Sequence, residues 1–367
     1  MKADGGRRNS ILSRVFFAQE SGLALVIVLV MIVLTLFGGQ KNKRVQDPVT
    51  KEWSTVPVNK FLDADNLVLL AKDASFIAIM AIGMTAIIVM SGIDLSIGSI
   101  YALAAVLGAM ALKALQAQWL GVSAEGSVSS VGGAPLWAAA AVGLGVCCAV
   151  GALCGLANGA MIVGLNVHPF IITLGTMAAL RGVVFLLTKG VSVIGFPEAF
   201  TRGFFKAEIG GVYPVPVIAM VIVVVAGALI LSRTVLGRRV YAIGGNEIAA
   251  RYAGVPVGRV KLVVYTLAGM LAGLSAAASI GYLGAADANA GQGYELSVIA
   301  ASVIGGASLS GGRGTALGAA LGAILIQLIT NAMVILEIDT SYTNIVMGVA
   351  IVGAVVLDQA KSRLTRR

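Results

Sequence analysis

Long apolar stretches follow one another along the chain, with short polar connections between them. A helix that crosses a bilayer needs about 20 mainly apolar residues. The pattern predicts ten such spans: 20–38, 67–90, 97–115, 136–163, 170–188, 213–232, 261–283, 296–309, 316–336 and 343–358. The eighth span is short, and the fourth is long enough to include an end at the membrane surface. We therefore expect an all-α integral membrane protein with a single transmembrane domain, 20–358.

Composition supports a membrane protein and argues against a nucleic-acid partner. Of the 367 residues, 58% are hydrophobic and only 12% are charged, and the mean hydropathy is +0.95. A soluble domain has no core large enough to bury so much apolar surface, so membrane lipid is the expected surrounding. The formal charge of +9 is gathered in short segments between the apolar runs. This distribution reflects membrane topology rather than binding to a polyanion.

The basic segments predict the orientation of the chain. Cytoplasmic loops carry an excess of Lys and Arg, which places the N-terminal tail 1–19, the segment 237–261 and the C-terminal tail 359–367 on the cytoplasmic side. The first span follows a basic start but lacks a small-x-small cleavage site, so we expect it to be retained. One connection disagrees: 39–66 carries five basic residues, although ten spans place it outside.

The segment 237–261 is too polar and too interrupted to cross the bilayer. Asn246 is a favourable N-cap, Glu247 places a carboxylate at the positive end of a helix dipole, and Gly254 followed by Pro256 is a stop signal. These residues predict one short helix, Glu247–Ala253, on the membrane surface. Ile248 and Tyr252 share one face of it, and Glu247 can pair with Arg251 on another. The helix is either a docking element for a partner or a solvated connector.

A short motif occurs twice. Gly92–Ile97 and Gly293–Val298 share the order glycine, apolar, acid, Leu, Ser, β-branched residue, and each precedes a predicted span. In the predicted topology the two copies lie on opposite sides of the membrane. The chain is therefore expected to contain two inverted four-helix repeats plus extra helices, a construction used for alternating access.

Polar residues within or next to the spans are candidates for a translocation path or gate. A carboxylate near a span is costly unless it is satisfied, so Asp94 and Glu295 either cap the following helices or line the path. The remaining candidates either bond to neighbouring helices or form a weakly charged path suited to a neutral polyhydroxylated solute. The candidate set is Asp94, Ser96, Asn158, Thr173, Tyr282, Glu295 and Asn331. Arg181, near a membrane face, is expected to snorkel.

The sequence offers no catalytic or metal site. The three Cys residues fall in one apolar run, and the single His, His168, has no carboxylate cluster near it. No phosphate-binding Gly-x-x-x-x-Gly-Lys-Ser/Thr loop or nucleophile motif is present. We therefore expect no enzyme activity and no cofactor in this chain. If it pumps, another chain supplies the energy, and the helix Glu247–Ala253 is the natural connection.

Several motifs together resemble the permease subunits of bacterial monosaccharide ABC importers of the ribose, xylose and arabinose class. The resemblance covers roughly residues 60 to 358. The segments that carry it are Gly237–Arg251, Ser91–Ser99, Gly291–Leu296, Phe61–Leu67, Phe170–Leu174 with Arg181–Gly182, and Gly305–Gly314.

The resemblance implies a complex in the bacterial inner membrane. It would contain a dimer of permeases, an ATPase dimer on the cytoplasmic face that holds ATP and Mg, and a periplasmic sugar-binding protein. In that family the short cytoplasmic helix is the coupling helix, which corresponds here to Asn246–Pro256. The coupling residues would be Asn246, Glu247, Ile248, Arg251, Tyr252, Gly254 and Pro256.

Three segments depart from the family pattern: 39–59, 116–135 and His168–Pro169. The first two could alter docking of the binding protein, and the third could alter contact with the ATPase. The alternative function is a stand-alone secondary transporter or channel for a small neutral solute, although no intramembrane acid–base relay supports it. A membrane enzyme would need a nucleophile or metal constellation that the sequence lacks.

Overall fold

The computed structural model of this chain describes residues 19–46, 52–119, 134–210 and 212–339, together with scattered positions between 342 and 356. The transmembrane domain is α-helical, with one small hairpin. In chain order the elements are α2 (Gln19–Phe37), β1 (Gln40–Gln46), β2 (Trp53–Asn59), α3 (Ala64–Val89), α4 (Ile97–Trp119), α5 (Leu136–Gly164), α6 (Pro169–Thr188), α7 (Glu198–Phe200), η1 (Thr201–Phe205), α8 (Val215–Arg233), α9 (Val235–Gly245), α10 (Glu247–Tyr252), α11 (Val257–Leu283), α12 (Tyr294–Ile304) and α13 (Ala316–Ile335).

Eight of the described helices are long and apolar enough to cross a membrane. They correspond to the first seven predicted spans and to the ninth, which confirms the all-α membrane fold. The predicted span 343–358 and the tails 1–19 and 359–367 lie largely or wholly outside the described residues, as does most of 116–135.

The eighth predicted span, 296–309, is not one continuous membrane-crossing helix. α12 has 11 residues, so at about 1.5 Å per residue it is roughly half as long as a bilayer-crossing helix. The helix ends because Gly305 and Gly306 follow it, and Gly306 has φ of +100°. A side chain on Gly305 would overlap the backbone of Gly318 in α13. Glycine here permits the close contact that turns the chain back.

The long helices lie side by side around α11, which contacts α5 most extensively. A Cβ on Gly155 of α5 would overlap the carbonyl oxygen of Tyr265 in α11, and one on Gly151 would overlap that of Gly269. These small-residue faces are therefore contacts within one chain, where close backbone approach holds helices together in lipid. α3 is also largely buried, whereas few residues of α2, α6 and α8 are buried.

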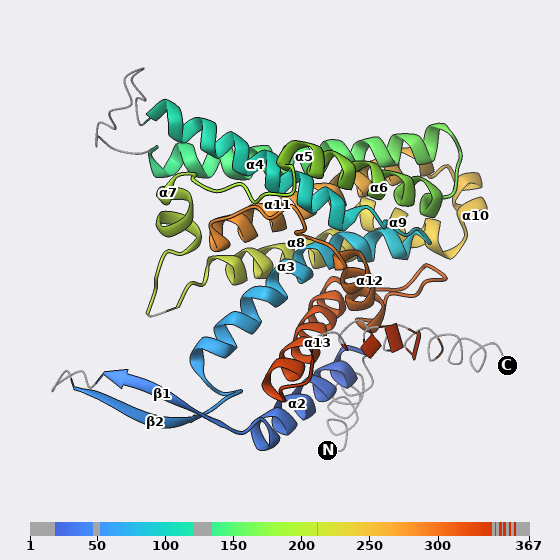
Figure 1. Ribbon diagram of the computed structural model, residues 1–367. Coiled ribbons are helices and arrows are strands. Elements are labelled where there is room, and N and C mark those ends of the chain that lie inside the picture. The colour runs from blue at the N-terminus through green and yellow to red at the C-terminus, as the bar shows by residue number, and fades with distance from the viewer. Residues whose placement is uncertain are drawn as a thin grey trace, which may run out of the picture.

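The molecule has two distinct ends (Figure 1). α10 lies at one end of the helix layer, and α7 and the β1–β2 hairpin lie at the other. The described part of the basic connection 39–66 therefore lies at the end opposite α10, as the five observed spans between them require. Among the described residues of this segment, Lys43 contacts Asp63 and Asp65, each at 2.6 Å, and Lys60 contacts Glu337 at 2.6 Å. Because acids neutralise these lysines, the segment is less basic than its Lys and Arg count suggests.

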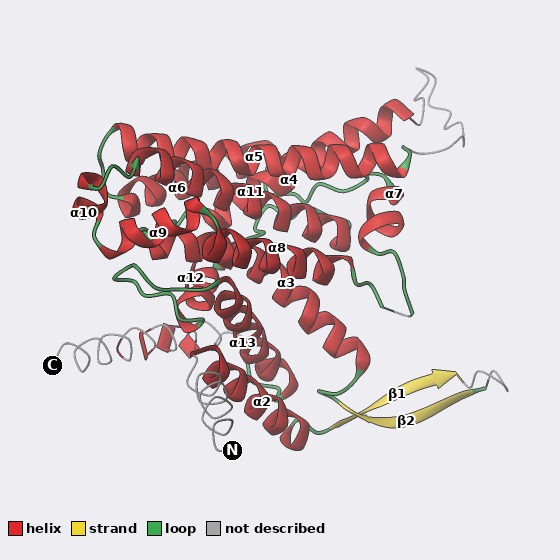
Figure 2. Cartoon of the chain, turned by 180° about the vertical axis from the view of Figure 1, so that it is seen from behind, coloured by secondary structure: helices red, strands yellow, loops and turns green. Residues whose placement is uncertain are grey.

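The polar stretch near α10 contains two helices rather than the one predicted. α9 begins after Thr234, whose hydroxyl accepts a hydrogen bond from Gly237 N at 3.2 Å, and it ends where Asn246 adopts extended backbone. Its glycines, which suggest a loop, are needed for packing because a Cβ on Gly244 would overlap the carbonyl oxygen of Val89. Figure 2 shows α9 and α10 as successive short helices at this end of the molecule.

Candidate functional site

α10 is a capped helix with the predicted start. The Asn246 side-chain oxygen accepts a hydrogen bond from Ala249 N at 2.9 Å, which satisfies one of the free donors of the first turn. Ala253 follows as the C-cap, and Gly254 then adopts φ of +80°. The chain turns there into Pro256 and α11. The observed Glu247–Tyr252 thus agrees with the predicted Glu247–Ala253 to within one residue.

Glu247 links α10 to α11 through an ion pair with Lys261. Its carboxylate accepts hydrogen bonds from Arg251 at 3.2 Å and from Lys261 of α11 at 2.8 Å. Partial burial works to raise the pKa of Glu247, but the hydrogen bonds and charges of Lys261 and Arg251 outweigh it and hold the pKa below its ordinary value. The predicted Glu247–Arg251 pair is present, and Lys261 is a partner that the sequence pattern did not single out.

The outer face of α10 presents two large apolar side chains to solvent. Ile248 is 70% exposed and Tyr252 is 89% exposed. They lie one helical turn apart, as predicted. Aromatic residues exposed in this way are enriched in protein interfaces, whereas Ala250 on the opposite face is buried. The helix therefore has one face for its own bundle and one that is free to contact another chain.

A cavity of about 420 Å³, the α10 cavity, opens beside this helix. Gly92, His168, Glu247, Lys261 and Tyr265 are among the residues that line it. His168 Nδ1 accepts a hydrogen bond from Phe170 N at 3.3 Å, so this histidine caps α6. No cluster of His, Cys, Asp and Glu with metal-binding arrangement occurs among the residues that the structure describes.

Asp94, Ser96 and Asn158 form one buried polar cluster. Asp94 Oδ1 accepts hydrogen bonds from Ser96 N at 2.8 Å and from Ser96 Oγ at 2.6 Å. Asn158 Nδ2 of α5 donates to Ser96 Oγ at 2.7 Å. All three side chains are nearly inaccessible to solvent. The carboxylate therefore fixes the start of α4, and the structure brings three of the predicted residues together.

Thr173 adjoins this cluster, because its hydroxyl lies 3.4 Å from the carbonyl oxygen of Ile93. Its shorter hydrogen bond is to Pro169 O in its own helix, at 2.9 Å. Tyr282 lies elsewhere, with Lys72 Nζ 4.7 Å and Lys206 Nζ 5.3 Å from its ring centroid. Asn331 is also separate, since it donates to Asn66 Oδ1 at 2.7 Å and joins α13 to α3. The structure therefore does not gather the predicted set at one place.

Two glycines that flank the copies of the repeated motif, Gly98 and Gly291, are in contact. A Cβ on Gly98 would overlap the carbonyl oxygen of Gly291, and a Cβ on Gly291 would overlap that of Gly98. Gly291 also has φ of +72°, a conformation that favours glycine. The start of α4 and the segment before α12 are thus in direct backbone contact. The sequence did not predict this contact, although both glycines lie in segments that carry the family resemblance, Ser91–Ser99 and Gly291–Leu296.

Glu295 and Arg181 hold the segment that precedes α12. Glu295 Oε1 accepts a hydrogen bond from Gly293 N at 3.3 Å, which is the capping role expected of it. Arg181 donates to Ala290 O at 2.8 Å and to Ala288 O at 3.4 Å. The guanidinium of Arg181 therefore binds backbone carbonyls of the connection 284–295, a contact that the sequence did not predict.

A second cavity, the distal cavity, lies at the end of α11 remote from α10 and has a volume of about 440 Å³. Asp73, Phe76, Tyr101, Ser192 and Tyr294 are among the residues that line it. Tyr101 and Gly98 both belong to the first turns of α4. The stretch Gly92–Tyr101 thus reaches from the α10 cavity to the distal cavity, with the Asp94 cluster and the Gly98–Gly291 contact between the two.

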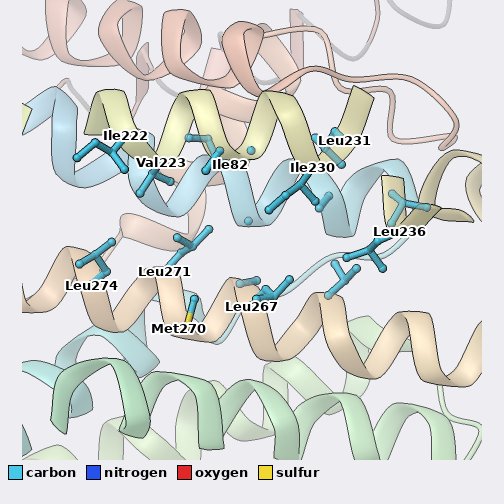
Figure 3. A pocket seen from close by; sticks show the side chains of 17 residues that line it. Ile82, Ile222, Val223, Ile230, Leu231, Leu236, Leu267, Met270, Leu271 and Leu274 are labelled. Carbon is cyan, nitrogen blue, oxygen red and sulfur yellow. The ribbon is translucent and has the colours of Figure 1, made fainter. Parts of the chain in front are cut away.

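A third cavity is lined only by apolar residues and glycine. Its volume is about 260 Å³, and it lies between α3, α8, α9 and α11. Figure 3 shows Ile222 and Ile230 on one side, facing Leu267 and Leu271 on the other. Since no side chain here can bond a hydroxyl group, this cavity suits hydrocarbon and not a polar solute.

Comparison with known proteins agrees with the resemblance seen in the motifs. Residues 66–355 match the family model described as the branched-chain amino acid transport system permease component. The ribose import permease protein RbsC of Escherichia coli K12 is 35% identical over 97% of this chain and 98% of its own. The D-allose transport system permease protein AlsC of the same strain is 37% identical over 83% of this chain and 86% of its own.

A third relative is the ribose import permease protein RbsC of Bacillus subtilis 168, which is 38% identical over 82% of this chain and 87% of its own. No solved structure matches the chain.

Proposed function

This chain belongs to the family of ABC importer permeases defined by the branched-chain amino acid transport system permease component, and from that premise we propose that it carries a monosaccharide across the bacterial inner membrane. Relatives that are named for ribose and allose import match it over most of their length. A five- or six-carbon sugar such as ribose or allose is therefore the proposed cargo.

We infer that α10 is the coupling helix. The observation that carries this proposal is a capped helix, fixed to α11 by the Glu247–Lys261 contact of 2.8 Å, that exposes Ile248 and Tyr252. The sequence has no phosphate loop of its own, so the energy of ATP must arrive through contact with another chain. A rigidly held helix with an exposed apolar face can transmit such a displacement into α11.

Transport would proceed by alternating access. The α10 cavity and the distal cavity lie toward opposite ends, and the Asp94 cluster and the Gly98–Gly291 contact lie between them. Opening first one cavity and then the other would move the sugar without chemical change. In this proposal α10 and both termini face the cytoplasm, and the β1–β2 hairpin faces the periplasm.

The proposed assembly contains two permease copies, an ABC ATPase that binds ATP and Mg, and a periplasmic sugar-binding protein. The test is uptake of radiolabelled ribose and allose by proteoliposomes that contain the permease alone, with its ATPase, or with ATPase and binding protein. We expect uptake only in the complete system with ATP. ATP-independent uptake by the permease alone would instead establish a channel or secondary transporter.

A further inference from the structure

We propose that the distal cavity is a binding site for the transported sugar within the permease itself, with Asp73 and the Tyr101–Tyr294 ring pair as its recognition groups. This inference rests on the proposed function. It adds a substrate site in this chain, separate from the one in a soluble binding protein. The cavity lies between α3, α4, the end of α11 and the segment that precedes α12, and its volume of about 440 Å³ falls in the range of small-molecule sites.

The first argument is the aromatic wall. The rings of Tyr101 and Tyr294 have centroids 5.2 Å apart and an interplanar angle of 53°, and Phe76 lies at the same cavity. Tyr101 and Phe76 are almost fully buried, so their rings are held in place by the surrounding helices. Sugar rings present faces of C–H groups that pack on aromatic rings, while their hydroxyls point outward. This wall therefore matches one face of a monosaccharide.

The second argument is the set of polar groups around this wall. Asp73, Ser192, Asp287 and Asn289 all line the cavity. Carboxylates accept strong hydrogen bonds from hydroxyl donors, and the Asn side chain can both donate and accept. A cavity with one aromatic wall and a few converging polar groups has the composition of a ligand site rather than of lipid-facing surface.

The third argument concerns charge and favours a neutral ligand over a cation. Lys72 Nζ lies 3.0 Å from Asp73 Oδ1, and the lysine side chain is only 6% exposed. The same ammonium group lies over the ring of Tyr282. Asp287 accepts hydrogen bonds from Asn289 N at 2.6 Å and from Ser192 Oγ at 3.1 Å. Since both carboxylates already have partners, the site bonds hydroxyl groups without attracting a metal ion strongly.

The fourth argument is that the cavity walls are fixed in position. Val193 and Ala286 exchange two backbone hydrogen bonds of 2.9 Å, and Arg181 bonds the carbonyl oxygen of Ala290. These contacts hold the segment with Ser192 against the segment with Asp287 and Asn289. A site that is ordered before binding loses less entropy when it takes up its ligand.

The test uses the complete transporter in nanodiscs with Ser192→Cys as a reporter inside the cavity. A hydrophilic thiol reagent is applied at increasing ribose concentrations, and glycine betaine at equal osmolality is the solute control. The unsubstituted protein gives the background from native cysteines. Ser54→Cys on the β1–β2 hairpin is the matched reporter outside the cavity. We expect ribose to slow modification of Ser192→Cys and to leave Ser54→Cys unaffected.

Second substitutions in the reporter background then test the recognition groups. We expect Asp73→Asn to raise the ribose concentration for half-protection at least tenfold. Tyr294→Leu should do the same, whereas Tyr294→Phe, which keeps the ring, should change it less than threefold. Failure of ribose to protect Ser192→Cys in a transporter that imports ribose would overturn the site and leave the proposed function intact. Absence of ATP-driven uptake in the unsubstituted transporter would instead overturn the proposed function.

Discussion

Gly98 and Gly291 are separated by most of the chain, yet their backbones touch so closely that neither position can hold a Cβ. Glu295 Oε2 lies 2.7 Å from where a Cβ on Gly98 would be, so the acid of the second motif also crowds the glycine that follows the first motif. This contact joins the residues that flank the two copies of the repeated motif, between the α10 cavity and the distal cavity. Under the proposed alternating access, it is the point at which a path between the two cavities would be closed.

We expect Gly98→Ala to disrupt this closure. The added methyl group must displace the Gly291 backbone, and overpacking of this kind costs about 1–3 kcal/mol. Import of ribose should fall by more than tenfold, and the Tm in detergent should drop. Gly175→Ala in α6 is the matched control because nothing lies within 4 Å of its added Cβ. If Gly98→Ala transports as well as Gly175→Ala, the contact does not matter for transport.

Asp94 should tolerate an isosteric amide better than loss of the side chain. Asp94→Asn keeps an oxygen that accepts from Ser96 N and Oγ. Asp94→Ala leaves both Ser96 donors buried without this acceptor, which lowers the free energy of unfolding by about 1–3 kcal/mol. We expect a clear loss of thermal stability only for Asp94→Ala. Uptake assays then separate the two roles of the carboxylate. A stable Asp94→Asn protein with more than tenfold slower import would show that the charge acts in the path as well as in the cap.

Arg181 should need its guanidinium and not only its charge. Two carbonyls, those of Ala288 and Ala290, accept from one nitrogen of this group, and hydrogen bonds from charged donors contribute about 1.5–3 kcal/mol. We expect Arg181→Ala to reduce import strongly and Arg181→Lys to recover only part of it. Arg202→Lys, in an exposed pair with Glu198, serves as the control and should change little. Full recovery by lysine would contradict the positional role.

A proline in α10 should uncouple ATP hydrolysis from transport. Ala250 N donates to Asn246 O at 2.9 Å, so Ala250→Pro removes a helical hydrogen bond and costs about 3 kcal/mol locally. We expect ATP-driven import to be abolished while the bundle remains folded, as shown by an unchanged elution volume and helical circular dichroism. Ala250→Ser keeps the hydrogen bond and should retain import. Normal import by the proline variant would refute the assignment of α10 as the coupling helix.

The attachment of α10 should weaken in acid. Because the pKa of Glu247 in the folded protein lies below its ordinary value of 4.5, its stabilisation is complete above pH 4.5 and is lost as the pH falls through the folded-state pKa. The pairs are partly exposed, so their contribution is only about 0.5–1 kcal/mol. The Tm difference between the parent protein and Glu247→Gln should be largest near neutral pH and should disappear in acid. A difference that does not depend on pH would exclude the ion pairs as its cause.

The parts of the fold that local sequence rules decide were predictable. Hydropathy places the long helices because lipid imposes the same requirement on every span, and the ends of α10 follow from the cap at Asn246 and the glycine at Gly254. The pairing of Glu247 with Arg251 follows from helical spacing alone.

The remaining features depend on contacts between distant segments. Gly237 and Gly244 look like helix breakers, but in α9 they permit close approach to neighbouring backbone. The short length of α12 depends on the packing of Gly305 against Gly318. Likewise, Lys72 and Asp73 occur in a run that hydropathy assigns to a span, and only the fold shows that Asp73 lines the distal cavity and that Lys72 lies over the ring of Tyr282. Periodicity along one segment contains no signal for such pairs.

The antiparallel hairpin β1–β2 has a further consequence for how the transporter is loaded. Gln40 pairs with Asn59 at its base and Gln46 with Trp53 near its tip, and Lys43 binds Asp63 and Asp65 at the entrance to α3. A partner protein that displaces this hairpin would therefore displace the start of α3, whose residues Asp73 and Phe76 line the distal cavity. In the proposed transporter, we therefore expect that docking of a sugar-loaded binding protein on this hairpin shifts one wall of the distal cavity.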